Sequence, residues 1–288
     1  MTLLRADIRK KVYANGCCAI ENLAFEAQSG EFVAIVGPSG AGKTTLLNLI
    51  AGLDRELDGS IEFHSDQGRE ASPRTSFMFQ EPRLMPWLTV QQNLELVLAP
   101  QLRLHQVTPL QDLLALVGLP GCGAMFPSQL SGGMQRRVAL LRAFIVEPDL
   151  LLMDEPFQSL DVPTANQLRI LLQDLWQRTR PTVLFVTHSL REAISLADRI
   201  LFLSGRPSKV ILDLPVDLQH PRAIEDLSVQ KLHESILGQH PELLGGQILP
   251  AGGNSHDARF ARDGEVPFVK RQPMGVDRRV EDRRERCS

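Results

Sequence analysis

The sequence predicts an α/β fold built on a largely parallel sheet with an all-helical segment inserted into it. The apolar run 32–36 is followed by a glycine-rich loop and by a helical pattern that ends at Gly52, which gives the order strand, loop, helix. Residues 150–153 form another uninterrupted apolar run, as expected for a parallel strand covered on both faces. Residues 89–147 show helical periodicity only, which indicates a helical subdomain that interrupts the sheet.

Length and composition are those of an ordinary globular chain. The 288 residues are 43% hydrophobic and 23% charged with a net charge of -3, and this length allows one large domain or two smaller ones. The near-neutral charge argues against non-specific binding of nucleic acid. The four cysteines have the spacing of neither a zinc site nor a disulfide framework, so we expect reduced thiols.

The sequence shows no pattern that targets or anchors it to a membrane. Residues 1–11 carry five charged side chains and no long apolar stretch follows them, so we expect no signal peptide. No apolar run approaches the roughly 20 residues needed to cross a bilayer. Any membrane role is therefore expected to depend on a partner chain.

The glycine-rich loop fills every fixed position of the phosphate-binding pattern G-x-x-x-x-G-K-[ST]. Its glycines let the backbone turn its NH groups inward, so that these groups and a helix N-terminus face a polyphosphate. Lys43 adds a positive charge at the β and γ phosphates, and Thr44 offers a hydroxyl to Mg²⁺. The residues expected to bind the nucleotide here are Gly37, Pro38, Ser39, Gly40, Ala41, Gly42, Lys43, Thr44 and Thr45.

Carboxylates directly follow the apolar run 150–153, at the edge where open α/β sheets bind ligands. Asp154 is placed to hold Mg²⁺ or its waters, and Glu155 to orient or deprotonate an attacking water. Gln80 ends the strand predicted over 75–79. Its amide oxygen can contact a metal ion or hold a water, and the alternative is an ordinary polar cap.

A second anion-binding feature begins the helix predicted over 134–146. Ser131, Gly132 and Gly133 there offer a hydroxyl, free NH groups and the positive end of a helix dipole. His188 ends the strand predicted over 182–187. It can donate a hydrogen bond to a phosphate or serve as an ordinary turn histidine, and the sequence alone favours the turn.

Two further features each leave two interpretations open. Tyr13, the only tyrosine, lies between strands predicted over 3–8 and 19–26, where its ring either stacks on an adenine or packs against the chain. The loop 81–89 combines two prolines with leucine, methionine and tryptophan. It either docks another chain or is buried against its own domain.

The remaining elements follow from periodicity and turn signals. Pro163 begins a helix, and Ser189 with Glu192 predicts a capping box for the next one. Mixed charge with few large apolar residues predicts disorder for the tail 251–288. The other predicted elements are a strand at 58–63, helices at 90–98 and 109–117, strands at 199–203 and 209–214, and an amphipathic segment at 224–237.

Taken together, these motifs resemble the nucleotide-binding subunits of ABC transporters. The matching features are the loop 37–45, Gln80, the stretch 130–133, the pair Asp154 and Glu155, the turn 159–161, and His188. The resemblance covers residues from about 3 to 240. It implies an ABC ATPase domain at 3–222, with the P-loop NTPase core sheet, an antiparallel β subdomain and an α-helical subdomain at about 82–147. A short helical extension at 223–250 follows.

The resemblance also implies Mg-ATP hydrolysis at two sites of a head-to-tail homodimer. Each ATP then lies between the phosphate loop of one subunit and the 131–133 stretch of the other. The resemblance implies that Thr44 and Gln80 are Mg²⁺ ligands and that Asp154 supports the ion through waters. It implies that Glu155 is the catalytic base and that His188 contacts the γ phosphate. It further implies that Tyr13 stacks on the adenine and that Asp161 contacts the nucleotide. Met134 stands where glutamine is usual in this family, and we do not expect it to impair hydrolysis.

Within the family, residues 79–87 followed by 88–90 resemble the nitrate, sulfonate and taurine importer branch. This implies uptake of a small anionic solute through a permease that docks near residues 81–93. It also implies an extracytoplasmic solute-binding protein, and a peripheral position at the cytoplasmic face of the inner membrane. The alternative is a soluble ABC ATPase that acts on ribosomes or DNA. Such chains usually carry two nucleotide domains or a long coiled coil, and the sequence shows neither.

Overall fold

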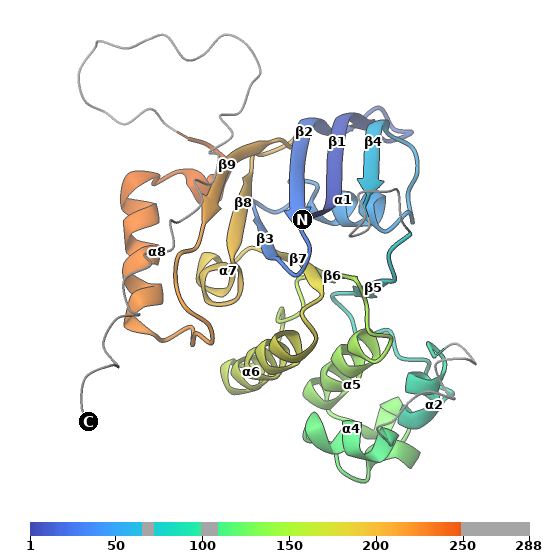
Figure 1. Cartoon of the computed structure of the whole chain (residues 1–288). Helices are drawn as coiled ribbons and strands as arrows, with labels where there is room; N and C mark the ends of the chain where they lie inside the picture. Colours follow the sequence, from blue (N-terminus) through green and yellow to red (C-terminus); the bar gives the residue numbers. More distant parts are fainter. Residues whose placement is uncertain (65–71, 99–108, 249–288) are drawn as a thin grey trace, which may run out of the picture. The chain divides into compact units, whose positions relative to one another are not determined.

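The computed structural model describes residues 1–64, 72–98 and 109–248, and these residues form two sheets (Figure 1). The larger sheet has the order β5-β6-β7-β3-β8-β9, in which every neighbouring pair is parallel except β8 and β9. Its strands are β5 (Thr75–Met78), β6 (Leu150–Asp154), β7 (Thr182–Thr187), β3 (Phe32–Val36), β8 (Arg199–Leu203) and β9 (Val210–Pro215). The predicted largely parallel sheet is confirmed.

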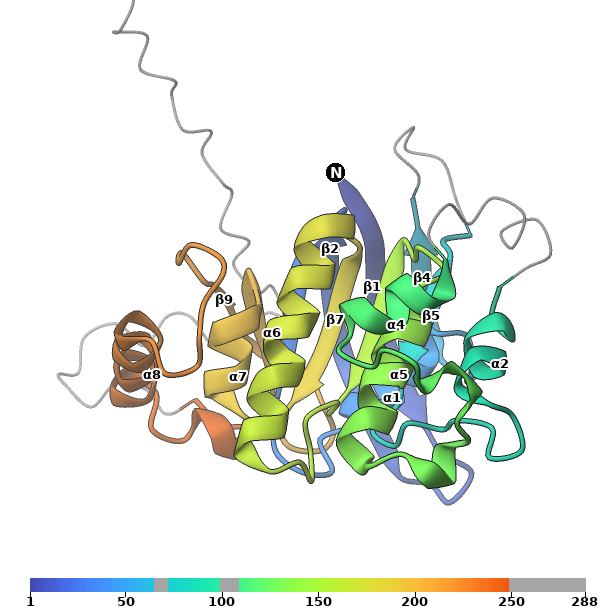
Figure 2. The same ribbon diagram turned by 90° about the horizontal axis from the view of Figure 1, so that it is seen from below.

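The inner strands of this sheet are apolar throughout because both of their faces are covered. In β3, Phe32, Ala34 and Val36 join one hydrophobic core, while Val33 and Ile35 join another on the opposite face. The helices that contribute to the first core include α5 (Gly132–Phe144), α6 (Val162–Thr179) and α7 (Leu190–Leu196), and Figure 2 shows them beside β7. Helix α1 (Lys43–Ile50) packs on the second face and ends before Gly52, as predicted.

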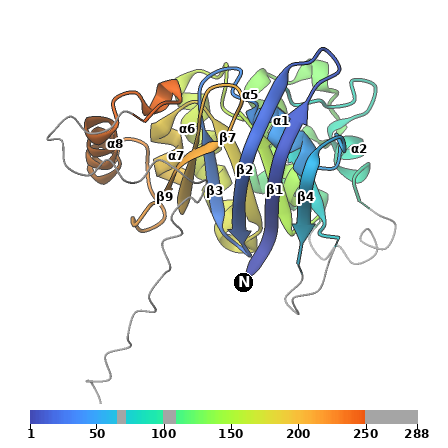
Figure 3. The same cartoon turned by 90° about the horizontal axis from the view of Figure 1, so that it is seen from above.

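The smaller sheet is antiparallel and lies over α1 and β3. Its order is β2 (Cys18–Gln28), β1 (Thr2–Val12) and β4 (Asp58–Phe63), which Figure 3 shows side by side. Buried and exposed residues alternate along β1, so that its apolar face packs against the second core. Strands β1 and β2 exceed their predicted ranges because the ladder continues through polar residues, such as the pair Lys10 and Glu21.

The chain between β5 and β6 is helical, with no strand among its described residues. Here lie α2 (Val90–Glu95), α4 (Leu110–Leu116), the 3₁₀ turns η1 (Cys122–Ala124) and η2 (Pro127–Gln129), and α5. These helices surround a hydrophobic core of their own, which includes Val90, Leu114 and Val138. Helix α2 is shorter than predicted because a turn follows it from residue 96. Residues 99–108 of the predicted helical segment lie outside the described residues.

The C-terminal extension contains α8 (Leu227–Gln239) and the 3₁₀ turn η3 (Leu243–Gly245). Val229, Ile236 and Leu243 are buried in the core that α6 and α7 also line. In the described part of the chain, no helix has the length and apolar character needed to span a membrane. The predicted disordered tail 251–288 and most of the loop between β4 and β5 lie outside the described residues.

Candidate active site

Four parallel strands bring the candidate residues to one edge of the larger sheet. The register pairs Val36 of β3 with Thr187 of β7, and Asp154 of β6 with Val186 of β7. Parallel strands present their carboxyl ends at the same edge, which is where open α/β sheets bind ligands. The candidate residues at or just beyond these strand ends are the phosphate loop 37–45, Gln80, Asp154, Glu155 and His188.

The phosphate loop adopts a conformation that requires glycine at two positions. Gly40 and Gly42 have φ angles of +78° and +87°, which side chains rarely adopt. A Cβ on Gly42 would also lie 3.2 Å from the carbonyl oxygen of Ala19. Helix α1 starts directly after Gly42 with no side-chain cap. Its first NH groups are therefore available to a phosphate.

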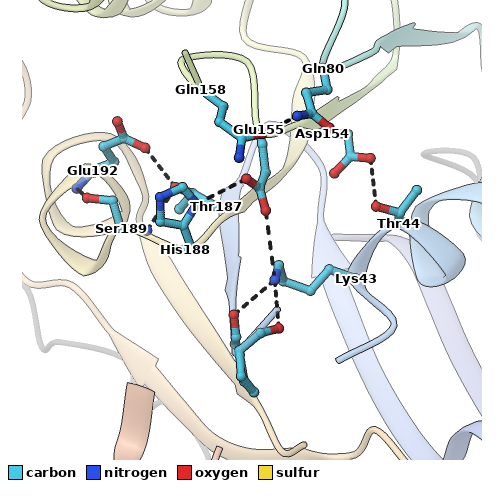
Figure 4. A network of polar contacts seen from close by, with 12 residues as sticks. Lys43, Thr44, Gln80, Asp154, Glu155, Gln158, Thr187, His188, Ser189 and Glu192 are labelled. Carbon is cyan, nitrogen blue, oxygen red and sulfur yellow. Dashed lines mark hydrogen bonds and ion pairs between the residues drawn. The ribbon is translucent and has the colours of Figure 1, made fainter. Parts of the chain in front are cut away.

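Lys43 and Glu155 lie next to each other in the centre of the site (Figure 4). The Lys43 Nζ donates to the carbonyl oxygens of Gly37 and Pro38, at 2.9 and 3.0 Å, and lies 3.9 Å from Glu155 Oε1. Burial lowers the pKa of Lys43, and the nearby carboxylates of Glu155 and Asp154 oppose that effect.

The other carboxylate oxygen of Glu155 faces His188. Glu155 Oε2 lies 3.0 Å from His188 Nδ1, and the histidine ring is 58% exposed (Figure 4). The φ angle of Glu155 is +44°, an uncommon value for a residue with a side chain. Such strained backbone is often found at functional sites. Glu155 is thus held between a lysine and a histidine at the sheet edge.

Asp154 and Thr44 form the second half of the site. The Thr44 hydroxyl lies 2.8 Å from Asp154 Oδ2 and donates to it. Burial raises the pKa of Asp154, while the hydrogen bond from Thr44 opposes the shift. Gln80 extends from the end of β5 and donates to Gln158 (Figure 4).

The oxygen atoms of this second half fit a magnesium ion. Mg²⁺ prefers hydroxyl, carboxylate, amide and water oxygens, and it usually keeps several of its waters. Across residues 1–64, 72–98 and 109–248, no group of three or more His, Cys, Asp or Glu side chains is placed to hold a metal ion. An ion here would be held by oxygens such as those of Thr44 and Gln80, together with nucleotide and water.

Replacing Asp154 by asparagine is expected to stabilise the nucleotide-free protein at neutral pH. Because burial raises the pKa of Asp154 in the folded chain, its ionised form is less favourable there than in the unfolded chain. Stability therefore falls as the pH rises from the unfolded-state pKa through the folded-state pKa. The variant lacks this titration, so its advantage in melting temperature should grow across that interval and then stay constant.

The control for this prediction is Asp7→Asn, which makes the same substitution at an exposed position of β1 and should leave the melting temperature close to the wild-type value. Thermal melting between pH 4 and pH 8 measures both variants. A melting temperature of Asp154→Asn at or below the wild-type value at pH 7 would contradict the prediction.

Tyr13 lies beside the start of α1. Its hydroxyl is 2.7 Å from the Thr45 hydroxyl, and the Nζ of Lys11 is 5.2 Å from the centre of its ring. Tyr13 is 38% exposed. The hairpin between β1 and β2 therefore holds this ring next to the phosphate loop with part of its surface open.

The 131–133 stretch forms the N-terminus of α5. The Ser131 hydroxyl caps the helix by accepting from the NH of Met134 at 3.3 Å. A Cβ on Gly132 would meet nothing within 4 Å, whereas one on Gly133 would lie 2.6 Å from a methyl carbon of Thr164. In the described part of the chain, no hydrogen bond or ion pair joins this stretch to the residues of Figure 4. Gly132 thus leaves open space, and Gly133 lets α5 approach α6.

Asp161 acts as a helix cap in this chain. Its carboxylate accepts from the NH of Thr164 at 3.2 Å at the start of α6, and hydrogen bonding to Thr164 lowers the pKa of Asp161. A nucleotide contact by Asp161 is not tested by these contacts and stays a prediction.

The predicted capping box of α7 is only half formed. The NH of Glu192 donates to the Ser189 hydroxyl at 3.3 Å, as predicted. The NH of Ser189 donates instead to the Thr187 hydroxyl at 3.1 Å, which itself donates to Glu192 Oε2 at 2.7 Å. The prediction was wrong in this half because the buried Thr187 hydroxyl lies between the two groups. This network fixes the turn that carries His188.

The sequence analysis missed two side chains that shape the site. Arg136 is 9% exposed and donates to the carbonyl oxygens of Pro156 and Gln158, both at 2.6 Å. It ties α5 to the loop that follows Glu155. A buried arginine needs such partners. Arg136 shares a face of the predicted helix with the apolar residues Ala139 and Leu140, and this was a usable signal. No signal in the sequence pointed to Gln158 as the partner of Gln80.

This fold and this edge define the class of α/β proteins with a phosphate-binding loop, here with the carboxylate of Glu155 beside Lys43 of the loop. Residues 20–158 match the family model described as ABC transporter. A related structure is the dimeric, post-hydrolysis state of an ATP-binding cassette bound to ADP and Pi. It has a TM-score of 0.62 and 28% identity, and the match covers 75% of this chain and 100% of that one.

Curated relatives agree with this match. The aliphatic sulfonates import ATP-binding protein SsuB of Bacillus cereus is 38% identical over 220 residues, which cover 76% of this chain and 87% of the relative. SsuB 1 of Pseudomonas aeruginosa is 44% identical over 209 residues, which cover 70% and 83%. The SsuB of Bacillus subtilis is 39% identical over 223 residues, which cover 76% and 86%.

The chain belongs to the ABC transporter family, as an ATP-hydrolysing subunit of the sulfonate, nitrate and taurine importer type. The predicted ABC ATPase fold is confirmed. The alternative of a soluble ATPase that acts on ribosomes or DNA is not favoured, because the relatives are import proteins. Membership of this type implies a dimer of ATP-binding subunits and a membrane permease as a partner.

Proposed function

We propose that this chain hydrolyses Mg-ATP in a head-to-tail homodimer and thereby drives uptake of an aliphatic sulfonate or a similar small anion. The observation that carries the proposal is the position of Glu155, 3.9 Å from Lys43 Nζ and 3.0 Å from His188 Nδ1 beside the phosphate loop. A carboxylate there can act on a water next to a bound γ phosphate. The names of the relatives supply the solute class.

Binding of the phosphates is assigned to the loop 37–45. Without nucleotide, the Nζ of Lys43 donates to the loop's own carbonyl oxygens, those of Gly37 and Pro38. On binding, the ammonium would turn to the β and γ phosphates, and the NH groups at the start of α1 would donate to the same phosphates. Tyr13 would stack its open face on the adenine.

Binding of Mg²⁺ is assigned to Thr44 and Gln80, with Asp154 acting through waters. The Thr44 hydroxyl can donate a hydrogen bond to Asp154 and still offer an oxygen lone pair to the ion. Asp154 can therefore keep its hydrogen bond with Thr44, and so orient the Thr44 hydroxyl, while Thr44 binds the ion. Mg²⁺ held by these residues would supply positive charge that offsets the negative charge of the nucleotide phosphates.

Glu155 would accept the proton of the attacking water, and His188 would contact the γ phosphate. A neutral histidine has one ring proton, so it cannot donate both to Glu155 through Nδ1 and to a phosphate through Nε2. A hydrogen bond from His188 Nε2 to the γ phosphate therefore requires a second ring proton, a proton on Glu155, or a break in the 3.0 Å contact with Glu155. Gln80 would also help to position the water.

Closure of the site is assigned to a second copy of the chain. Residues Ser131, Gly132 and Gly133 of that copy would offer a hydroxyl, NH groups and a helix N-terminus to the γ phosphate. The exposure of Ser131 and Gly132 supports this role, because a ligand on another subunit can reach them. Asp161, at the start of α6, would lie in the same interface.

Docking of the permease is assigned to residues 81–93. Trp87 on this loop is 70% exposed, while Leu84 packs against the core of the helical segment. A large exposed aromatic on a partly packed loop is typical of a protein interface. The chain would then be peripheral at the cytoplasmic face of the inner membrane. A solute-binding protein outside the membrane would deliver the anion.

Uptake of labelled solutes in a strain that lacks this chain tests the proposed substrate. We expect loss of taurine or alkanesulfonate uptake and of growth on these compounds as the sole sulfur source. Nitrate and cyanate uptake should remain normal. A defect in nitrate or cyanate use alone, or no defect on any of these solutes, would contradict the sulfonate assignment and leave the ATPase assignment in place.

A further inference from the structure

The turn between β8 and β9, residues 204–209, joins the phosphate loop to the hairpin that carries Tyr13. The Nε of Arg206 donates to the carbonyl oxygen of Gly40 at 3.0 Å, and its Nη1 lies 3.3 Å from the sulfur of Cys17. The NH of Ser208 donates to the carbonyl oxygen of Ala19 in β2 at 2.9 Å. A displacement of this turn would therefore move both the phosphate loop and the hairpin that carries Tyr13.

Gly246, directly after η3, packs against the same turn. It has a φ angle of +79°, and a Cβ at this position would overlap the backbone nitrogen of Gly205. That Cβ would also lie 2.8 Å from the carbonyl carbon of Ser204 and 3.1 Å from the ring of Pro38 in the phosphate loop. Leu243 is fully buried in the main core and anchors this segment.

We propose that the packing of Gly246 against the turn 204–209 sets the affinity of the phosphate loop for ATP. This inference rests on the proposed role of the loop in binding ATP. Gly246 faces the backbone of Ser204 and Gly205 and the ring of Pro38, and neither that backbone nor a proline ring can yield as a flexible side chain does. A shift of the C-terminal segment therefore moves the turn, and Arg206 passes the movement to Gly40. A ligand or partner that displaces the segment would weaken ATP binding.

The full-length Gly246→Ala variant tests this coupling. We expect the KM for ATP to rise about three- to tenfold with kcat within about twofold of wild type, because the loop loses preorganisation while Glu155 stays in place. A structural defect alone would lower the fraction of active protein, and hence the apparent kcat, without raising KM.

Two glycines provide matched controls. A Cβ on Gly245 would meet only a carboxylate oxygen of Glu242 at 3.8 Å, so Gly245→Ala adds the same atom without the close backbone contact. Gly121 has a φ of +75° and open space around its Cβ position, so Gly121→Ala adds backbone strain away from the turn. Both variants should keep the wild-type KM for ATP.

The Arg206→Ala variant provides a second test, which is needed because release of the C-terminal segment from the turn could relieve the clash in Gly246→Ala. It should raise the KM in the same direction, and the double variant should show less than the sum of the two effects because both act through one turn. A wild-type KM in Arg206→Ala, or full additivity in the double variant, would overturn the proposal.

If Glu155→Gln is inactive and Gly246→Ala keeps a wild-type KM, this inference fails and the proposed function stands. If Glu155→Gln hydrolyses ATP normally, the proposed function itself fails.

Discussion

Replacing Glu155 by glutamine is expected to lower kcat for ATP hydrolysis by about 10²- to 10⁴-fold, the range that a general base contributes. Glutamine keeps the size and hydrogen-bonding shape of the side chain but cannot accept a proton from water. The contacts that hold the phosphates lie on other residues, namely Lys43 and the loop NH groups. The dissociation constant for ATP should therefore change by less than about threefold.

Phosphate release measures the first effect, and light scattering in the presence of ATP should show a dimer that persists because the nucleotide is not consumed. Glu234→Gln, an exposed change on α8, is the matched control and should hydrolyse ATP at the wild-type rate. Rapid hydrolysis by Glu155→Gln would mean that another group is the base.

Replacing Lys43 by methionine is expected to weaken ATP binding by about 10- to 100-fold. Hydrogen bonds to charged groups contribute about 1.5–3 kcal/mol, and about 1.4 kcal/mol corresponds to a factor of ten. Lys43 is only 6% exposed, so methionine is preferred to alanine because it keeps the volume of the buried stem. Lys43→Ala should show the same loss together with some loss of stability.

Fluorescent nucleotide titration measures this affinity directly. Lys231→Met removes an equal charge from the surface of α8 and should leave the affinity unchanged. An unchanged dissociation constant for Lys43→Met would show that the ammonium stays on the carbonyl oxygens of Gly37 and Pro38 when nucleotide is bound.

The two variants separate binding from chemistry. The charge of Lys43 acts on both the bound state and the transition state, so its loss should reduce affinity and turnover together. Glu155 acts only in the chemical step, so its loss should reduce turnover alone. Parallel losses of affinity in both variants would mean that Glu155 helps to bind the nucleotide.

The sequence by itself determined the phosphate loop and the parallel strands, because both depend on local patterns. The positive φ angles of Gly40 and Gly42 strongly favour a residue without a side chain, so the spacing of these glycines predicts the loop directly. The apolar run 150–153 predicts a strand covered on both faces. Once such strands are parallel, the carboxylates after one and the histidine after another must share an edge.

Only the tertiary structure decided which side chains hold this edge in place. Arg136 reaches the loop after Glu155, and Arg206 reaches Gly40 across 166 positions of the chain. The Thr187 hydroxyl enters the predicted capping box, and Gly246 meets the turn beside Pro38. Each of these contacts joins atoms whose proximity depends on how whole elements pack. Local periodicity carries no information about that packing. The sequence pattern therefore predicted the residues of the site but not the long-range contacts that hold them in position.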